Sequence, residues 1–281
     1  MKKRALGKTG ESLSVIGFGG ILLSGTTPAE AARLVASAVD HGVNYFDVAP
    51  TYSQAEERLG PALEPYRNQV FLACKTTARL AGPAEAELQQ SLKRLRTNRL
   101  DLYQFHGVTT ESDVDQILSA GGALETFLKA RDQGLVRFLG FSAHTQEAAI
   151  RLLASFAFDT VLFPINFACW TAGHFGPRVI QKAQERGTGV LALKAMARGP
   201  VGKGGPKKWS KCWYEPLDTP AEIKAALAFT LSKPVTAALT PGHAELFQKA
   251  CDAVEELEAD PTAINPDAGF TGAPLFNAPT P

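Results

Sequence analysis

Short apolar, β-rich runs alternate with helical stretches along almost the whole chain. Eight such runs occupy residues 15–18, 45–47, 70–75, 100–106, 137–142, 160–164, 190–194 and 235–239. They are apolar throughout instead of alternating in polarity, which is typical of parallel strands buried on both faces. Eight strand–helix repeats within 281 residues favour an α/β fold of the (β/α)8 TIM barrel type over a doubly wound sheet.

The segments between these runs have the spacing and the end signals of helices. We expect helices at residues 28–41, 56–63, 83–95, 122–132, 146–154, 177–186, 220–231 and 244–258. The first begins with Thr27 as N-cap and Pro28 at the first helical position. Before the first barrel strand, residues 2–6 and 11–14 flank a glycine-containing turn. This pattern predicts an N-terminal β-hairpin that closes the bottom of the barrel.

Two segments depart from this alternation. Residues 195–219 form a long connection rich in Gly, Pro, Lys and Trp, and a connection of this length is often a lid or a binding loop. Residues 259–281 are rich in Pro, Gly and Ala and are expected to form a C-terminal tail. We therefore expect one barrel domain over residues 1–281, with 259–281 as its tail.

Charge and cysteine content exclude several classes of function. The formal net charge is +1, so there is no electrostatic basis for binding nucleic acid or a membrane surface. No apolar run approaches the roughly 20 residues that a membrane-spanning helix needs. The four cysteines, at positions 74, 169, 212 and 251, lack metal-binding spacing, so we expect free thiols, no metal site and a cytoplasmic protein.

Polar side chains follow the predicted strands at the end where barrel enzymes have their active sites. Asp47 ends the second strand, Tyr52 follows it, Lys75 ends the third strand and His106 ends the fourth. Asp47 and Lys75 would form a buried ion pair, and the lysine charge would favour the phenolate of Tyr52. Each residue alone would have an ordinary structural role. Together on successive strands they indicate proton transfer by Tyr52, with His106 orienting a substrate carbonyl.

At these residues the chain resembles the aldo-keto reductase superfamily. The matching pieces, spread from Leu6 to about Val254, are residues 6–10, 16–20, 44–52, 92–95, 100–106 and 134–142. The resemblance implies a (β/α)8 barrel that binds NADP(H) in extended form and transfers hydride between the nicotinamide and a carbonyl or alcohol carbon. It places the catalytic tetrad on Asp47, Tyr52, Lys75 and His106, with Tyr52 as the general acid/base.

The resemblance also implies where the cofactor and the substrate bind. Ser142 and Asn166 are expected to hold the nicotinamide carboxamide, which needs both a donor and an acceptor. Backbone N–H groups near Gly199 and Gly242, with Lys194 or Arg198, are expected to meet the pyrophosphate. The predicted cofactor-binding residues are Gly19, Gly20, Asp47, Ser142, Ala143, Asn166, Lys194, Ala195, Arg198, Gly199, Thr240, Pro241, Gly242 and His243. The predicted substrate-pocket residues are Phe18, Tyr52, His106, Trp170 and Trp213, and Trp209 and Phe270 are further aromatic candidates.

The chain departs from the usual family pattern at three places. Many members have Ser-Asn after the fifth strand, where this chain has Ser142 followed by Ala143. Many have an aromatic residue on the seventh strand, where this chain has Leu193 and Lys194. The basic residue that meets the 2′-phosphate of NADP(H) usually follows the last strand, and no Arg or Lys stands there before Lys249. NADP(H) is the expected cofactor, and NAD(H) is the alternative.

Three functions remain open on the sequence. The first is an NADP(H)-dependent oxidoreductase that acts on a small carbonyl or alcohol substrate, as a monomer or a small homo-oligomer. The second is a nicotinamide-binding regulatory or scaffold subunit with little turnover. The third is a barrel hydrolase that uses a metal or paired carboxylates, but the predicted rim offers one Asp and one Lys instead of two acids.

Overall fold

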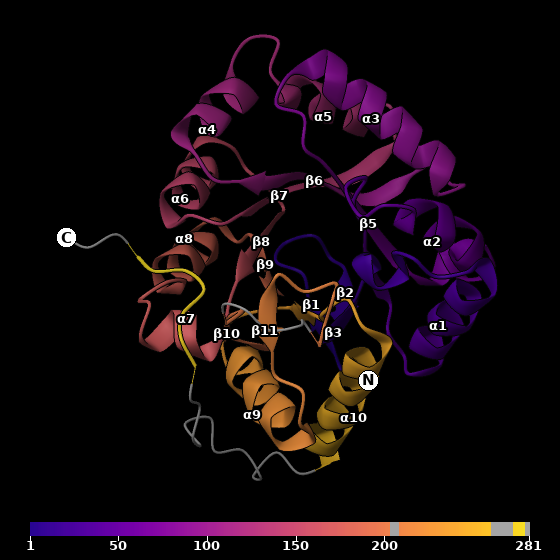
Figure 1. Cartoon of the computed structure of the whole chain (residues 1–281). Helices are drawn as coiled ribbons and strands as arrows, with labels where there is room; N and C mark the ends of the chain where they lie inside the picture. Colours follow the sequence, from indigo (N-terminus) through magenta and orange to yellow (C-terminus); the bar gives the residue numbers. More distant parts are fainter. Residues whose placement is uncertain (203–207, 260–271, 279–281) are drawn as a thin grey trace.

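Eight parallel strands close into a barrel in the computed structural model, which describes residues 1–202, 208–259 and 272–278 (Figure 1). The barrel strands are β3 (Ile16–Gly19), β4 (Tyr45–Asp47), β5 (Phe71–Thr76), β6 (Leu100–Val108), β7 (Val136–Ala143), β8 (Thr160–Pro164), β9 (Gly189–Leu193) and β12 (Ala237–Leu239). Neighbours in the barrel follow chain order, and β12 pairs in parallel with both β9 and β3 to close it. The predicted (β/α)8 barrel is therefore confirmed.

Helices surround the barrel and cover the outer face of its strands (Figure 1). They are α1 (Pro28–Asp40), α2 (Ala55–Leu63), α3 (Ala81–Arg94), α4 (Glu111–Leu118), α5 (Ala123–Asp132), α6 (Gln146–Ser155), α7 (Phe167–Thr171), α8 (Pro177–Arg186), α9 (Pro220–Leu231) and α10 (Ala244–Ala259). Two 3₁₀ helices, η1 (Gly20–Leu23) and η2 (Glu64–Gln69), lie in connections.

The start of α1 follows directly from its sequence. Thr27 Oγ1 accepts a hydrogen bond from the Glu30 backbone N–H at 3.3 Å, and the Glu30 carboxylate accepts one from the Thr27 backbone N–H at 2.8 Å. This reciprocal pair satisfies two of the backbone donors that every helix start leaves open. The sequence did not predict α4, although Thr110 and Asp113 form the same reciprocal pair at its start.

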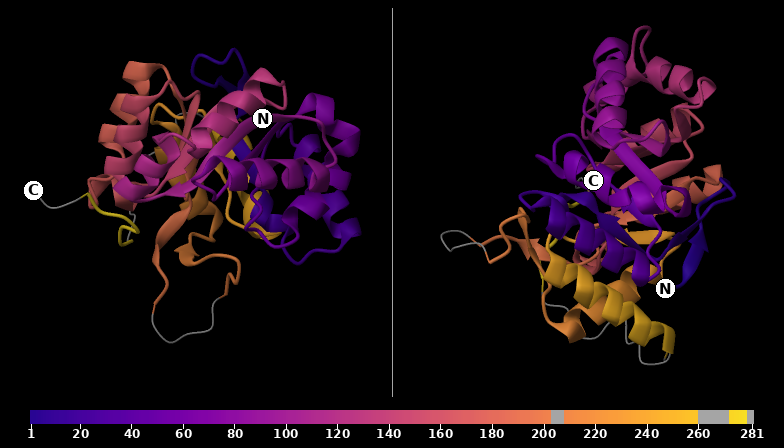
Figure 2. Two further views of the ribbon diagram at one scale, coloured as in Figure 1. Left: turned by 90° about the horizontal axis from the view of Figure 1, so that it is seen from above. Right: turned by 90° about the vertical axis from the view of Figure 1, so that its right-hand side faces the viewer.

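The N-terminal hairpin closes one end of the barrel. Strands β1 (Lys3–Ala5) and β2 (Ser12–Ser14) pair antiparallel, as the sequence predicted. The hairpin places Leu6 and Leu13, both fully buried, against interior residues of the barrel that include Tyr45 and Leu102. Figure 2 shows this hairpin in indigo at the opposite end of the barrel from the orange hairpin after β9. These apolar side chains fill one end of the barrel, and the polar side chains gather at the other end, where the strands have their C-termini.

The long connection after β9 has more structure than the predicted loop. Strands β10 (Ala197–Pro200) and β11 (Tyr214–Pro216) pair antiparallel within it, with an irregularity between Ala197 and Gly199. Trp209, which lies between these two strands in the sequence, is buried in the main hydrophobic core and packs against His243 after β12, so the segment is anchored to the barrel. The described part of the tail, residues 272–278, packs against β10. A Cβ on Gly199 of this strand would lie 3.0 Å from the Ala273 carbonyl oxygen. Phe270, a predicted pocket aromatic, lies outside the described residues.

Among the described residues, no helix combines the length and the apolar character needed to cross a membrane.

Candidate active site

The C-terminal ends of β4 and β5 bring Asp47 and Lys75 together as a buried ion pair. Lys75 Nζ donates a hydrogen bond to Asp47 Oδ1 and a second one, at 3.3 Å, to the Val48 carbonyl oxygen. The side chains are only 1% and 2% exposed, so the pair has lost most of its hydration. Burial lowers the pKa of Lys75, but the charge and hydrogen bond of Asp47, together with Tyr52, raise it, and the net shift is upward, so Lys75 is a cation at neutral pH.

The second oxygen of Asp47 is held by two buried side chains. Gln104 Nε2 donates to Asp47 Oδ2 at 2.9 Å, and the Tyr45 hydroxyl donates to the same oxygen at 3.2 Å. With Lys75 on Oδ1, the carboxylate has a partner on each oxygen, which a buried charge requires. Asp47 is thus fixed in orientation and in turn fixes the position of the lysine ammonium.

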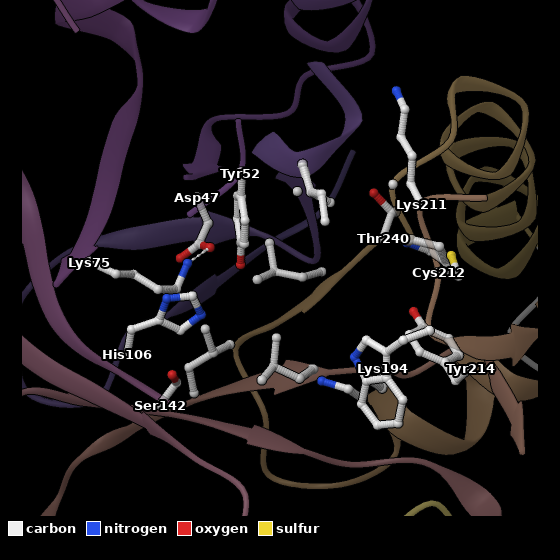
Figure 3. Close-up of a pocket in the computed structure, with 18 of the residues that line it drawn as sticks. Asp47, Tyr52, Lys75, His106, Ser142, Lys194, Lys211, Cys212, Tyr214 and Thr240 are labelled. Carbon is white, nitrogen blue, oxygen red and sulfur yellow. Dashed lines mark hydrogen bonds and ion pairs between the residues drawn. The ribbon is translucent and has the colours of Figure 1, made fainter. Parts of the chain in front are cut away.

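Tyr52 lies in the loop after β4 with its ring beside this ammonium. Lys75 Nζ is 5.4 Å from the centre of the ring, and the side chain is partly buried (Figure 3). Burial raises the pKa of Tyr52, while the positive charge of Lys75 lowers it and so opposes that increase. The net shift is upward, so Tyr52 is a neutral phenol at pH 7. It holds a proton that it can donate, beside a cation that would stabilise the resulting phenolate.

His106, on β6, completes the group of four that we call the tetrad: Asp47, Tyr52, Lys75 and His106. Its ring meets the Tyr52 ring edge to face, with 5.8 Å between the ring centres. Burial, together with the charge of Lys75, lowers the pKa of His106 to about 3. The imidazole is therefore neutral at pH 7 and offers one N–H donor and one acceptor. Its Nδ1 is buried and has no hydrogen-bond partner among the described residues.

The lowered pKa of His106 predicts a pH-dependent contribution to stability. Between the unfolded value of about 6.5 and the folded value of about 3, the unfolded chain binds more protons, so falling pH through this range destabilises the folded state. We expect His106→Asn to lose this contribution, so that its Tm falls less steeply than that of the wild type from about pH 6.5 to pH 4. Thermal unfolding measured across this range tests it, with exposed His174→Asn as the matched control. A constant offset in Tm at every pH would contradict the expectation.

All four residues of the tetrad border one cavity of about 210 Å³ at this end of the barrel. The cavity is lined by Gly19, Ile21, Asp47, Tyr52, Lys75, His106, Ser142, His144, Leu162, Leu193, Lys194, Lys211, Cys212, Trp213, Tyr214, Leu239, Thr240, Pro241 and Gly242. The residues come from all eight barrel strands or the loops that follow them, including the connection after β9. Eleven of these positions are ones that the sequence assigned to catalysis, cofactor or substrate: Gly19, Asp47, Tyr52, Lys75, His106, Ser142, Lys194, Trp213, Thr240, Pro241 and Gly242.

The structure places two predicted pocket aromatics away from this cavity. Phe18 is fully buried between Phe46 and Phe247, with ring centres 5.2 and 5.3 Å away, on the outer side of β3. Trp170, on α7, packs under the Lys233 ammonium, which lies 5.1 Å from the centre of the Trp170 ring. Neither side chain lines the cavity.

Three predicted phosphate-binding residues also have other partners. Arg198 forms an ion pair with Glu222 at 2.9 Å, on the far side of β10 from the cavity lining. Gly199 packs closely against the tail. The His243 Nε2 accepts a hydrogen bond from the Lys211 backbone N–H at 3.1 Å, and its ring packs against Trp209 at 5.1 Å. None of the three lines the cavity.

The remaining predicted cofactor residues, Gly20, Ala143, Asn166 and Ala195, are buried and are not among the residues that line the cavity. A Cβ on Gly20 would lie 2.8 Å from the Asp47 carbonyl oxygen, so this glycine permits the close approach of the loop after β3 to β4. These positions shape the wall of the cavity without forming its surface.

The sequence missed several lining residues, chiefly Lys211 and Tyr214 in the connection after β9. Tyr214 is buried on β11 and faces the cavity from the side opposite the tetrad (Figure 3). Lys211 Nζ donates to the Leu22 carbonyl oxygen at 2.7 Å and so reaches the loop after β3. The aromatic and basic residues of this connection could have indicated that it borders a binding site. Their orientation could not be predicted, because it depends on the pairing of β10 with β11.

Several features of the cavity fit a nicotinamide dinucleotide. Asn166 Oδ1 accepts from the Cys169 backbone N–H at 2.9 Å, whereas its buried Nδ2 has no partner among the described residues and remains a donor for an amide oxygen. Gly19 and Gly242 present bare backbone, since a Cβ would lie 2.8 Å from the Thr240 carbonyl oxygen and 2.9 Å from Ile21 Cγ2, respectively. Among the described residues, no group of three or more His, Cys, Asp and Glu side chains could hold a metal ion.

Comparison with known proteins agrees with the fold. Residues 15–262 match the model of the Aldo/keto reductase family. The uncharacterized oxidoreductase YqkF of Bacillus subtilis is 31% identical over 157 residues, 51% of this chain and 49% of the relative, so the chain matches about half the length of that relative. The L-galactose dehydrogenase of Arabidopsis thaliana is 26% identical over 251 residues, 82% of this chain and 75% of the relative.

A solved structure shares the fold. The aldo-keto reductase AKR11C1 from Bacillus halodurans, in its holo form, superposes with a TM-score of 0.72 at 24% identity, covering 91% of each chain. Together with the family match over most of the sequence, this defines the class of protein: the chain belongs to the aldo/keto reductase family.

Proposed function

We propose that this protein is an NADP(H)-dependent oxidoreductase that interconverts aldehydes or ketones with the corresponding alcohols, with Tyr52 as the general acid/base. The observation that carries the proposal is the convergence of Tyr52, the buried Asp47–Lys75 pair and a neutral His106 on one cavity. These side chains come from three successive barrel strands and the loop after the first of them.

The tetrad supplies and stabilises the proton of the reaction. In the direction of reduction, Tyr52 Oη donates its proton to the substrate carbonyl oxygen, and the resulting phenolate lies beside the Lys75 ammonium. Asp47 keeps that ammonium charged and in place, because its own two oxygens are held by Lys75, Gln104 and Tyr45. In the direction of oxidation the phenolate takes the proton back from the alcohol. When bound, the nicotinamide cofactor supplies the hydride to the carbonyl carbon or accepts it from the alcohol.

His106 has a different part from Tyr52. Since its pKa is about 3, it carries no ionisable proton to donate at neutral pH. A neutral imidazole still donates one N–H hydrogen bond, which would orient the carbonyl oxygen toward Tyr52 Oη. Tyr52 is then the proton donor and His106 the group that positions the substrate.

The residues that would hold the cofactor lie in or next to the cavity. Ser142, which lines it, and the buried Nδ2 of Asn166, which has no partner among the described residues, suit the carboxamide. Gly19, Thr240 and Gly242 suit the phosphates together with the charge of Lys211, because all four residues line the cavity. Lys211 replaces Arg198 in this proposal, since Glu222 neutralises Arg198.

Cofactor titration followed by a substrate panel tests the proposal. Protein fluorescence should be quenched by NADPH at lower concentrations than by NADH. The preferred cofactor should then be consumed with aldehydes, with ketones or, in reverse, with alcohols that include L-galactose, the sugar in the name of the Arabidopsis relative. Binding of NADPH without turnover across the panel would favour a nicotinamide-binding regulatory or scaffold subunit. Failure to bind either cofactor would contradict the proposal.

A further inference from the structure

Lys194 is a charged residue of the cavity that the proposed chemistry does not use. The charged side chains that line the cavity are Asp47, Lys75, Lys194 and Lys211. Asp47 and Lys75 neutralise each other as an ion pair. Lys211 Nζ is directed to the Leu22 carbonyl oxygen, away from the tetrad (Figure 3). The tetrad end of the cavity therefore has one positive charge in excess, on Lys194.

The ammonium of Lys194 has neutral neighbours. It lies 3.4 Å from His144 Nε2, 5.2 Å from the centre of the Trp213 ring and 5.9 Å from that of Phe276. Burial, together with the charge of Lys194, lowers the pKa of His144 to about 3, so at neutral pH its imidazole accepts a hydrogen bond from the ammonium. No carboxylate forms an ion pair with Lys194 within residues 1–202, 208–259 and 272–278.

The surroundings of Lys194 hold its ammonium in one direction. The residue directly follows β9 and has a φ of 57°, in the left-handed region that only a few non-glycine residues adopt. The His144 ring, which fixes the ammonium, stacks on Phe276 with 5.4 Å between ring centres and an angle of 5°. Phe276 stacks in turn on Phe175 at 5.3 Å. A strained backbone and a stack of rings thus orient one cation into the cavity.

We infer that Lys194 binds a carboxylate on the substrate, so that the natural substrate is an aldehyde, ketone or alcohol that also carries an acidic group. The inference rests on the proposed function for the carbonyl half of that substrate. A cation that has lost hydration and lacks an anionic partner is costly in a protein, and a ligand anion would offset that cost. Burial lowers the pKa of Lys194 to about 8, so the ammonium form still predominates at neutral pH.

One other source could supply the anion, namely a phosphate of the cofactor. The aromatic neighbour Trp213 favours the substrate, because it lines the cavity and offers apolar surface to an organic acid. Lys194 also lies on the same cavity as Tyr52 and Ser142, where the carbonyl would react (Figure 3). The carboxylate and the carbonyl of one small molecule would then be held at two points.

Binding of benzoate and benzamide distinguishes charge from shape without requiring turnover. Both are flat rings of similar size, and only benzoate is an anion. Calorimetry on the full chain, with and without NADPH, should give a benzoate affinity at least about 10-fold higher than that for benzamide, as for a charge-assisted hydrogen bond. Equal affinities would overturn the inference even if the protein proves to be an active reductase. A strong preference for benzoate in a protein that turns over no carbonyl compound would support the anion site and contradict only the proposed oxidoreductase activity.

Variants then identify the residue and the source of the anion. Lys194→Met should abolish the preference for benzoate, Lys194→Arg should keep part of it, and Lys208→Met, which removes an exposed lysine paired with Asp218 outside the cavity, should leave it unchanged. The Kd of NADPH should change less than about twofold in all three. A benzoate preference that persists in Lys194→Met would overturn the assignment to Lys194. A roughly 10-fold loss of NADPH affinity in that variant would also overturn it, and would indicate that Lys194 binds a cofactor phosphate. If Lys194→Met does not fold, the wild-type comparison and Lys194→Arg still decide.

Discussion

Replacing Tyr52 by Phe is expected to lower kcat by about 100- to 10,000-fold, the range that a positioned general acid contributes. The ring that lies 5.8 Å from His106 and 5.4 Å from Lys75 Nζ is kept, so only the proton-donating hydroxyl is lost. The affinity for NADPH and the Tm should remain close to those of the wild type. Steady-state kinetics, fluorescence titration and thermal unfolding measure the three quantities.

Tyr45→Phe is the matched control for this prediction. Tyr45 also has a buried hydroxyl next to Asp47, but it does not line the cavity. Its removal should leave Asp47 with Lys75 and Gln104 and lower kcat far less than Tyr52→Phe does. A Tyr52→Phe enzyme that retains full activity would show that the proton comes from another group, and the proposed mechanism would have to be abandoned.

Replacing Lys75 by Met is expected to harm both stability and catalysis. The substitution leaves the Asp47 carboxylate buried, with only Gln104 and Tyr45 as donors. Breaking a buried ion pair in this way costs about 3–5 kcal/mol of unfolding free energy. The kcat should fall by about 100-fold or more, because no cation remains beside the developing phenolate. Denaturant unfolding and steady-state kinetics test the two effects.

A double variant separates the two effects of Lys75. Asp47→Asn combined with Lys75→Met removes both charges of this buried pair, while Gln104 and Tyr45 keep a polar partner at position 47. Most of the lost unfolding free energy should return, whereas the activity should not. If the double variant is as unstable as Lys75→Met alone, the instability comes from lost packing and the charge of the unpaired carboxylate is not its cause.

The tetrad was predictable because the topology of a parallel barrel does most of the positioning. Once eight strand–helix repeats are recognised, the ends of neighbouring strands must meet at one rim, and Asp47, Lys75 and His106 stand at such ends. Their contacts need no knowledge of loops. Only Tyr52 lies in a loop, and that loop is short enough to keep it beside Lys75.

The aromatic part of the cavity was not predictable, for two physical reasons. Barrel strands are buried on both faces, so an apolar strand carries no alternation that tells which side faces inward; Phe18 faces the helices, while its neighbour Gly19 borders the cavity. The pairing of β10 with β11 places Tyr214 and Lys211. The register of these strands is too irregular for the sequence pattern to predict their pairing. Their positions follow from tertiary contacts, as the burial of Trp209 against His243 shows.

The contacts of Lys211 bear on the speed of the enzyme. Its backbone N–H binds His243 after β12, and its ammonium binds the Leu22 carbonyl oxygen after β3, so a single residue links three loops at the mouth of the barrel. Exchange of the proposed dinucleotide at this mouth would require both contacts of Lys211 to break. For good substrates this step would be slower than the chemistry, so different substrates would share one kcat while differing widely in KM.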